Sequence, residues 1–166
     1  GYSDLHFLIP ETVSKIDFGK GGYYAQEGDF NTAGYVDFST RDYLENSSIS
    51  FSAGQFNTLR TVGLFDLMEN TKNQNAYMAV EYLATDGPFE SPQNFNRLNM
   101  FGKYVMFSPE NDKLTLTASH FTSRWDASGQ IPQRAVDNGS ISRFGAIDDT
   151  EGGVTERTNF NVTFDK

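Results

Sequence analysis

Apolar and polar residues alternate one by one through much of this chain. In 48–53 every odd position is apolar and every even position is serine, and the stretches 114–119 and 159–164 repeat this alternation. A period of two places the two sets of side chains on opposite faces of a β-strand. Segments with a helical period and caps are nearly absent. The sequence therefore predicts an all-β protein.

The pattern predicts eight strands, and the last six of them have about ten residues or more. The expected ranges are 13–18, 35–40, 46–56, 59–69, 76–86, 97–108, 113–124 and 155–165. About ten residues is the length that a tilted strand needs to cross a bilayer, whereas strands of globular proteins usually have about five or six. We therefore expect an antiparallel meander that is part of a large outer-membrane β-barrel.

Two of the expected strands, 59–69 and 97–108, carry apolar residues on both faces, as at the neighbours Met100 and Phe101. A barrel strand of this kind is expected to be covered on its inner side, for example by a plug. The connections also differ in length, with a tight turn at Asn57 and long loops near 86–96 and 125–154. Long loops of outer-membrane barrels face outside, so we expect these two to be external.

Composition and charge exclude several classes of function. The formal net charge is −9 and no basic stripe is present, which argues against binding to nucleic acid. The chain has no cysteine and two separated histidines, His6 and His120, so we expect no disulfide and no metal site. Paired carboxylates such as Glu110 and Asp112 lie in a short polar turn. We expect neither an enzyme nor a bound cofactor.

Residues 5–40 carry the most informative motif of the chain. They begin LHFLIPE and continue as a strand, a glycine-rich loop and a second strand. The positions that carry the pattern are Glu11, Val13, Ile16, Phe18, Gly21, Tyr24, Gly28, Ala33, Gly34, Val36, Phe38 and Thr40. This stretch resembles the end of the plug domain of TonB-dependent outer-membrane receptors, and the strands that follow resemble the first strands of their barrel.

The resemblance has two departures. Gly22 stands where the family usually has proline, and about six barrel strands are expected here, whereas such receptors have about 22. The resemblance therefore implies a receptor fragment, with the C-terminal part of the plug in 1–42 and the first barrel strands in 43–166. Gly19, Gly21 and Gly22 fit a plug packed inside a barrel, because glycine permits positive φ and close approach of backbones.

The implied function is energised uptake of a scarce ligand across the bacterial outer membrane. The ligands of such receptors include metal chelates, vitamins and oligosaccharides. The implied partners are outer-membrane lipid and the TonB complex, which would bind the N-terminal part of the full receptor that this sequence lacks. Six strands of a barrel also leave two free edges and an apolar face. An isolated piece is expected to close on itself, swap strands or form oligomers.

Candidate ligand-binding residues lie in the expected external loops and in the plug loop. They are Trp125, Arg134, Arg143, Phe89 and Phe95, together with Tyr23 and Tyr24. Aromatic rings pack on sugars and chelates, and arginine pairs with anionic ligands. For Trp125 we favour another interpretation, a place in the belt of aromatic residues at the membrane interface. The two arginines equally suit neutralisation of the acidic residues beside them.

Two other interpretations remain open. One is a small complete outer-membrane barrel of about eight strands with a structural or adhesive function. The other is a secreted β-sandwich that binds carbohydrate, which predicts shorter strands in two mutually packed sheets.

Overall fold

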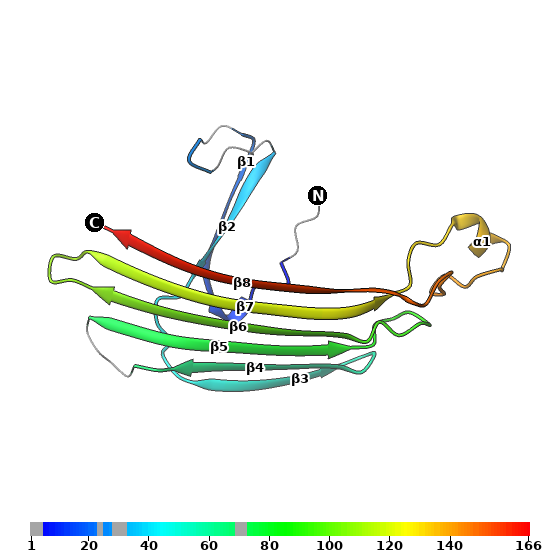
Figure 1. Ribbon diagram of the computed structural model, residues 1–166, viewed down its shortest axis with the longest axis horizontal. Helices are drawn as coiled ribbons and strands as arrows, with labels where there is room; N and C mark the ends of the chain where they lie inside the picture. The colour runs from blue at the N-terminus through cyan, green and yellow to red at the C-terminus, as the bar shows by residue number, and fades with distance from the viewer. Residues whose placement is uncertain (1–4, 23–24, 28–32, 69–72) are drawn as a thin grey trace.

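The computed structural model describes residues 5–22, 25–27, 33–68 and 73–166, which form two antiparallel sheets (Figure 1). The smaller sheet pairs β1 (Val13–Lys20) with β2 (Gly34–Thr40). The larger sheet contains β3 (Ser48–Gly54), β4 (Thr58–Asp66), β5 (Gln74–Thr85), β6 (Phe95–Phe107), β7 (Lys113–Ala127) and β8 (Glu151–Asp165), in sequence order. The described residues also include three short helices: η1 (Pro10–Thr12), η2 (Ala25–Glu27) and α1 (Gln133–Asp137).

The expected all-β fold and antiparallel meander are confirmed, and every expected strand is present. Some strand ends differ. Strands β3 and β4 have only 7 and 9 residues and end before the expected 56 and 69, whereas the hydrogen-bonded ladders of the later strands continue into stretches expected to be loops. Thr85 pairs with Phe95, and Ala127 pairs with Glu151. Phe95 and Trp125 therefore belong to strands β6 and β7, which corrects their placement in loops. The long loop is 128–150, and it contains one turn of helix, α1.

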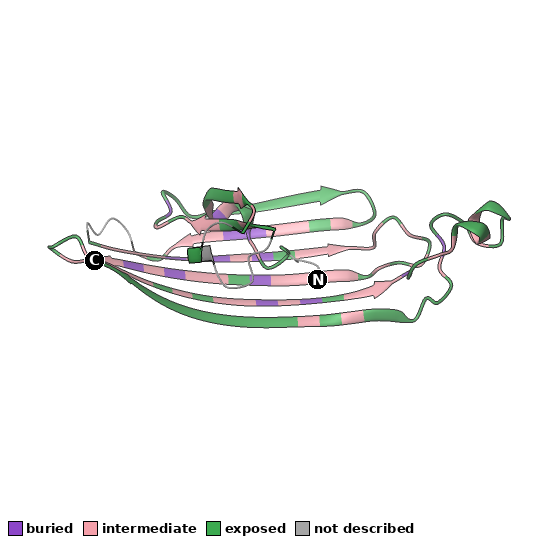
Figure 2. Cartoon of the chain, turned by 90° about the horizontal axis from the view of Figure 1, so that it is seen from above, coloured by how far each residue is buried: buried purple, intermediate pink, exposed green. Residues whose placement is uncertain are grey.

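The larger sheet is open. Strands β3 and β8 each pair on one side only, and nearly all of their residues are exposed (Figure 2). Buried residues are concentrated on the strands between them. The described chain thus does not close on itself, which removes one of the three expected ways of protecting the edges.

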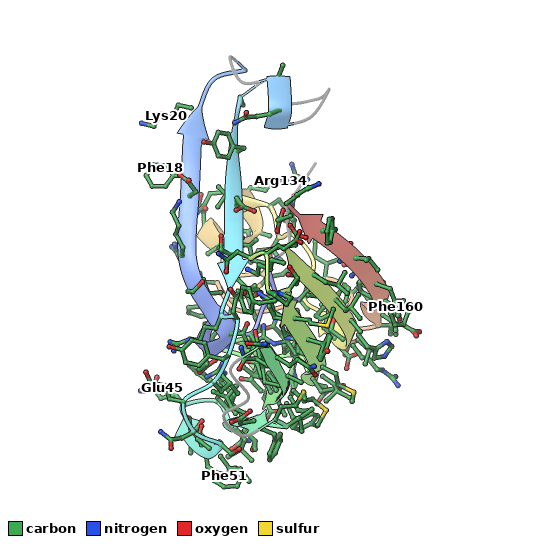
Figure 3. All side chains as sticks on the ribbon, turned by 90° about the vertical axis from the view of Figure 1, so that its left-hand side faces the viewer. Phe18, Lys20, Glu45, Phe51, Arg134 and Phe160 are labelled. Atoms are coloured by element: carbon green, nitrogen blue, oxygen red, sulfur yellow. The ribbon has the colours of Figure 1, made fainter. Side chains whose placement is uncertain are left out.

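The larger sheet is curved, and its two faces differ in chemistry (Figure 3). The hairpin β1–β2 stands on the concave side, whereas Phe51 and Phe160 point away from it on the convex side. The exposed apolar side chains of the convex face are Ile49, Phe51, Leu59, Tyr82, Met100, Leu116, Val154, Phe160, Val162 and Phe164. Side chains that alternate with these point to the concave face.

The N-terminal segment 5–12 covers the middle of the concave face. Ile9 is 2% exposed and packs with Val62 and Ala79, and the side chains of Leu64 and Phe101 extend this cluster. The expected cover on the inner side of the strands with two apolar faces is therefore present. It explains why β4 and β6 are apolar on both sides.

The β1–β2 hairpin uses glycine in the two expected ways, in its connecting loop at Gly21 and within β1 at Gly19. Gly21 has φ +86° and donates its N–H to Ala33 O at 2.8 Å. The ring of Tyr35 lies where a Cβ on its register partner Gly19 would stand. A side chain would be strained at the first position and would displace the ring at the second.

Candidate functional site

Glu81 is the centre of a buried polar cluster on the concave face. Its side chain is fully buried, and it accepts hydrogen bonds from Arg60 Nε at 2.6 Å and Arg97 Nη2 at 3.1 Å. Asn99 Nδ2 donates to the other carboxylate oxygen at 2.8 Å. These residues meet because of the strand register. Glu81 pairs with Val62 on β4 and with Asn99 on β6. Arg60 lies two positions before Val62 and Arg97 two positions before Asn99, so both arginines are on the same face as Glu81.

The same cluster binds the N-terminal segment to the sheet. Arg60 donates through Nη1 and Nη2 to the two carboxylate oxygens of Glu11 at 2.7 and 2.8 Å. Asn99 Nδ2 also donates to the backbone oxygen of His6 at 2.7 Å. The hydrogen bonds from Arg60 hold the pKa of Glu11 below its ordinary value of 4.5. A forked arginine–carboxylate pair fixes orientation as well as distance.

A second ionic cluster binds the link between the two sheets. Lys103 Nζ lies 2.9 Å from a carboxylate oxygen of Asp42 and donates to Thr40 O and Oγ1, both at 3.0 Å. Lys113 Nζ donates to the other carboxylate oxygen of Asp42 at 2.7 Å. Burial raises the pKa of Asp42, but the hydrogen bonds from Lys113 and Lys103 outweigh it and leave this pKa below its ordinary value. Tyr77 Oη adds a bond to Arg41 O at 3.0 Å.

The two ionic clusters flank the apolar contact around Ile9, so charged groups and packed side chains together hold 5–12 and 40–42 on the sheet. Within the Glu81 cluster, Arg97 Nε and Asn99 Oδ1 are buried and have no hydrogen-bond partner in the structure. Buried ion pairs specify geometry strongly but contribute little net stability, because both charges lose their hydration. Such an arrangement fixes the register in which the segment docks on the sheet.

Acid is expected to release the N-terminal segment from the sheet. The pKa values of Glu11 and Asp42 are lower in the folded chain than their ordinary values of 4.5 and 3.8. The ionised carboxylates therefore stabilise the docked state at neutral pH. This stabilisation is lost as the pH falls below the ordinary pKa values and through the lowered pKa values of the folded chain. Glu11 binds the N-terminal segment and Asp42 binds the link 40–42 behind it, so proteolysis of both stretches as a function of pH measures the release. The double variant Glu11→Gln, Asp42→Asn should be cleaved faster at pH 7, and its cleavage rate should depend less on pH. If the cleavage rate of that variant depended on pH as in the parent, Glu11 and Asp42 would not be the groups responsible.

Two of the expected ligand residues come together at the end of the sheet with the long connections. Phe95 and Trp125 line a hollow of about 290 Å³ with His6, Gln93 and Ser123. Trp125 alternates with outward-facing Arg124 and lies on the concave side of β7. The interface-belt interpretation needs a ring on the convex side, so this placement favours the ligand-stacking alternative.

The other expected ligand residues lie elsewhere. Phe89 contacts Phe144 across the two long loops, with ring centroids 6.3 Å apart. Arg134 on α1 and Arg143 in the following turn are exposed, and neither lines the hollow of Trp125. Tyr23 and Tyr24 lie outside the described residues.

Sequence reasoning missed the Glu81 cluster and the polar lining of the hollow. One signal was available, because Glu81 interrupts the apolar run AYMAVEYLA, where a lone carboxylate needs a partner. No comparable signal marks His6, Gln93 or Ser123. Their contribution depends on the docking of the N-terminal segment and on the path of the loop 86–94.

The described part of the chain contains no group of three or more histidine or carboxylate side chains that could hold a metal ion. None of its helices is long and apolar enough to span a membrane. Comparison with protein-family models, with curated proteins and with solved structures finds no match for this chain.

Proposed function

We propose that this chain is the part of a TonB-dependent outer-membrane receptor in which the end of the plug meets the first strands of the barrel. In this proposal the protein takes up a scarce ligand at the bacterial outer membrane, and the TonB complex supplies the energy. The motif in 5–40 suggests the family. The observation that carries the proposal is the course of the apolar residues across the convex face.

The apolar band runs diagonally over the sheet. On β3 it is centred on Phe51, and on β8 it is centred on Val162, between Phe160 and Phe164. Val154 is separated from this group by Glu156 and Thr158 and lies outside the band. Successive register partners of Phe51 on the neighbouring strands are Thr61, Tyr82, Leu98, Thr122 and, on β8, Glu156. Glu156 lies six residues before Val162. On β5 the band, from Ala76 to Tyr82, lies between these extremes.

The size of this offset matches strands that cross a bilayer at a tilt. Six residues of strand span about 20 Å, and five inter-strand spacings span about 24 Å. If the centre of the band lies at the same membrane depth on every strand, a shift of about 20 Å along the strands over about 24 Å across them means that the strands are tilted by about 40° from the membrane normal. Strands of barrels are usually tilted by about 35–45°. A soluble sheet with one buried face has no reason to shift its apolar residues in this way, because its partner layer follows the strands.

The concave face supports the same proposal from the other side. Beside the apolar cluster around Ile9 it carries charged and polar side chains, and the segment that precedes the strands is bound there by ion pairs that are partly or fully buried. A barrel that contains a plug needs a polar interior of this kind. The ion pairs would hold the plug in place until the TonB complex displaces it.

Single cysteines test the lipid-facing assignment cleanly, because the chain has no cysteine of its own. In lipid vesicles, Phe51→Cys and Phe160→Cys are expected to resist a membrane-impermeant maleimide. Their neighbours Ser52→Cys and Asn159→Cys on the concave face should react readily. Equal reaction of the two pairs would contradict the proposal, and shielding of the convex pair without lipid would favour the β-sandwich.

The receptor identity is tested by the native reading frame on both sides of this segment. We expect an upstream plug with a TonB-contacting segment and about sixteen further barrel strands downstream. A frame without them would overturn the receptor proposal and leave the small barrel or the secreted module to be tested.

A further inference from the structure

The hollow beside Trp125 lies where the N-terminal segment, the loop 86–94 and the strands β6 and β7 converge. Its lining residues are His6, Gln93, Phe95, Ser123 and Trp125, and its volume is about 290 Å³. This volume is just below the range of about 300–1,000 Å³ for sites that bind drug-sized ligands. In the proposed receptor, the hollow lies at the end of the sheet with the long loops, which would face outside.

The aromatic rings of the hollow are held in place before any ligand binds. A Cβ on Gly153 would stand 2.6 Å from Trp125 Cζ2, so the ring lies over the bare backbone of its register partner. Phe95 meets the ring of His6 edge to face, with centroids 5.6 Å apart. Gln93 is fixed by its backbone, which accepts from Asp126 N and donates to Asp86 O, both at 2.7 Å. Preorganised groups lower the entropic cost of binding.

The chemistry of the lining selects against charged ligands. None of the five lining residues is a lysine, arginine, aspartate or glutamate. An anionic chelate needs cationic partners, but Arg134 and Arg143 are exposed on the distal loop and do not line the hollow. The lining instead offers aromatic surface for C–H groups and amide, hydroxyl and imidazole groups for hydrogen bonds.

We propose that this hollow binds one unit of a neutral carbohydrate, with the sugar ring packed on Trp125 and Phe95 and its hydroxyl groups bonded to Gln93 and Ser123. The inference rests on the proposed receptor function and narrows its ligand from chelates, vitamins and oligosaccharides to the last of these. It assigns the two arginines no part in this contact.

Trp125 is the single tryptophan of the chain, so its fluorescence reports on the hollow directly. The 166-residue chain in detergent micelles is titrated with maltohexaose, cellohexaose, laminarihexaose and mannohexaose, and with ferric citrate as the anionic probe. Calorimetry gives a second readout. At least one hexaose should bind saturably and change the emission, and ferric citrate should not. Failure of all four sugars, or binding of ferric citrate alone, would overturn the inference.

Variants locate the contact. Phe95→Ala should weaken sugar binding about tenfold by removing one aromatic surface. Gly153→Ala should have a similar effect, because the new methyl group displaces the Trp125 ring, and circular dichroism checks that this variant folds. Phe89→Ala and the double variant Arg134→Ala, Arg143→Ala are matched controls that should bind as the parent does. If the control variants lost sugar binding and Phe95→Ala did not, the assignment of the sugar to this hollow would be wrong.

The failure of this inference is distinguishable from failure of the receptor proposal. If the convex cysteines are shielded by lipid but no sugar binds, the ligand assignment is wrong and the receptor proposal stands. If the convex cysteines react and a sugar still binds at Trp125, the hollow is a carbohydrate site in a protein of another class.

Discussion

Replacing Glu81 with alanine is expected to lower the free energy of unfolding by about 3–5 kcal/mol, which is the usual cost of removing one partner from a buried ion pair. Glu81 is fully buried and joins Arg60, Arg97 and Asn99. Without it, Arg97 loses its only ion pair among the described residues, while its Nε is already buried without a partner. Urea unfolding of the chain in detergent micelles measures the change.

The Glu81→Ala variant should also loosen the N-terminal segment, because Arg60 and Asn99 connect Glu81 to Glu11 and to the backbone of His6. Protease cleavage in 5–12 should therefore become faster by a larger factor than cleavage elsewhere. Glu45 is exposed in the link between the sheets (Figure 3), and Glu45→Ala is the matched control, with an expected change below about 0.5 kcal/mol. Similar losses in the two variants would show that the Glu81 cluster has no special role.

Replacing Val162 with arginine is expected to cost about 2–4 kcal/mol when the chain is unfolded from lipid vesicles, as for a cation at the midplane of a membrane β-sheet. Val162 is 73% exposed on the convex face and lies at the centre of the apolar band on β8. In a bilayer this side chain would be surrounded by acyl chains, which do not hydrate a guanidinium group.

The adjacent residue supplies the control. Asn161 is exposed on the concave face of the same strand and donates a long hydrogen bond of 3.4 Å to Thr117 Oγ1. Asn161→Arg is expected to cost less than about 1 kcal/mol, since its charge would remain in a polar interior. Equal costs for the two neighbours would mean that lipid does not contact the convex face, and the diagonal band would need another explanation.

Much of the fold could be predicted from local pattern alone. The alternation around Phe51 and Phe160 marks strands and their two faces, because side chains of a strand point to opposite sides whatever its neighbours are. The tight turn at Asn57 and the special backbone at Gly21 are likewise local properties of a few residues. The apolar residues on both faces of 97–108 even indicated that something must cover the inner side.

The candidate site depended on contacts that no local pattern contains. Glu11 meets Arg60 across 49 positions, and Asn99 meets His6 across 93. Such contacts follow from strand register, and a shift of one residue would turn Glu81 or Trp125 to the other face. The pattern around Trp125 shows an aromatic residue near a strand end. The register and the docked N-terminal segment, which only the tertiary structure provides, place its ring beside Phe95 and His6 in one hollow.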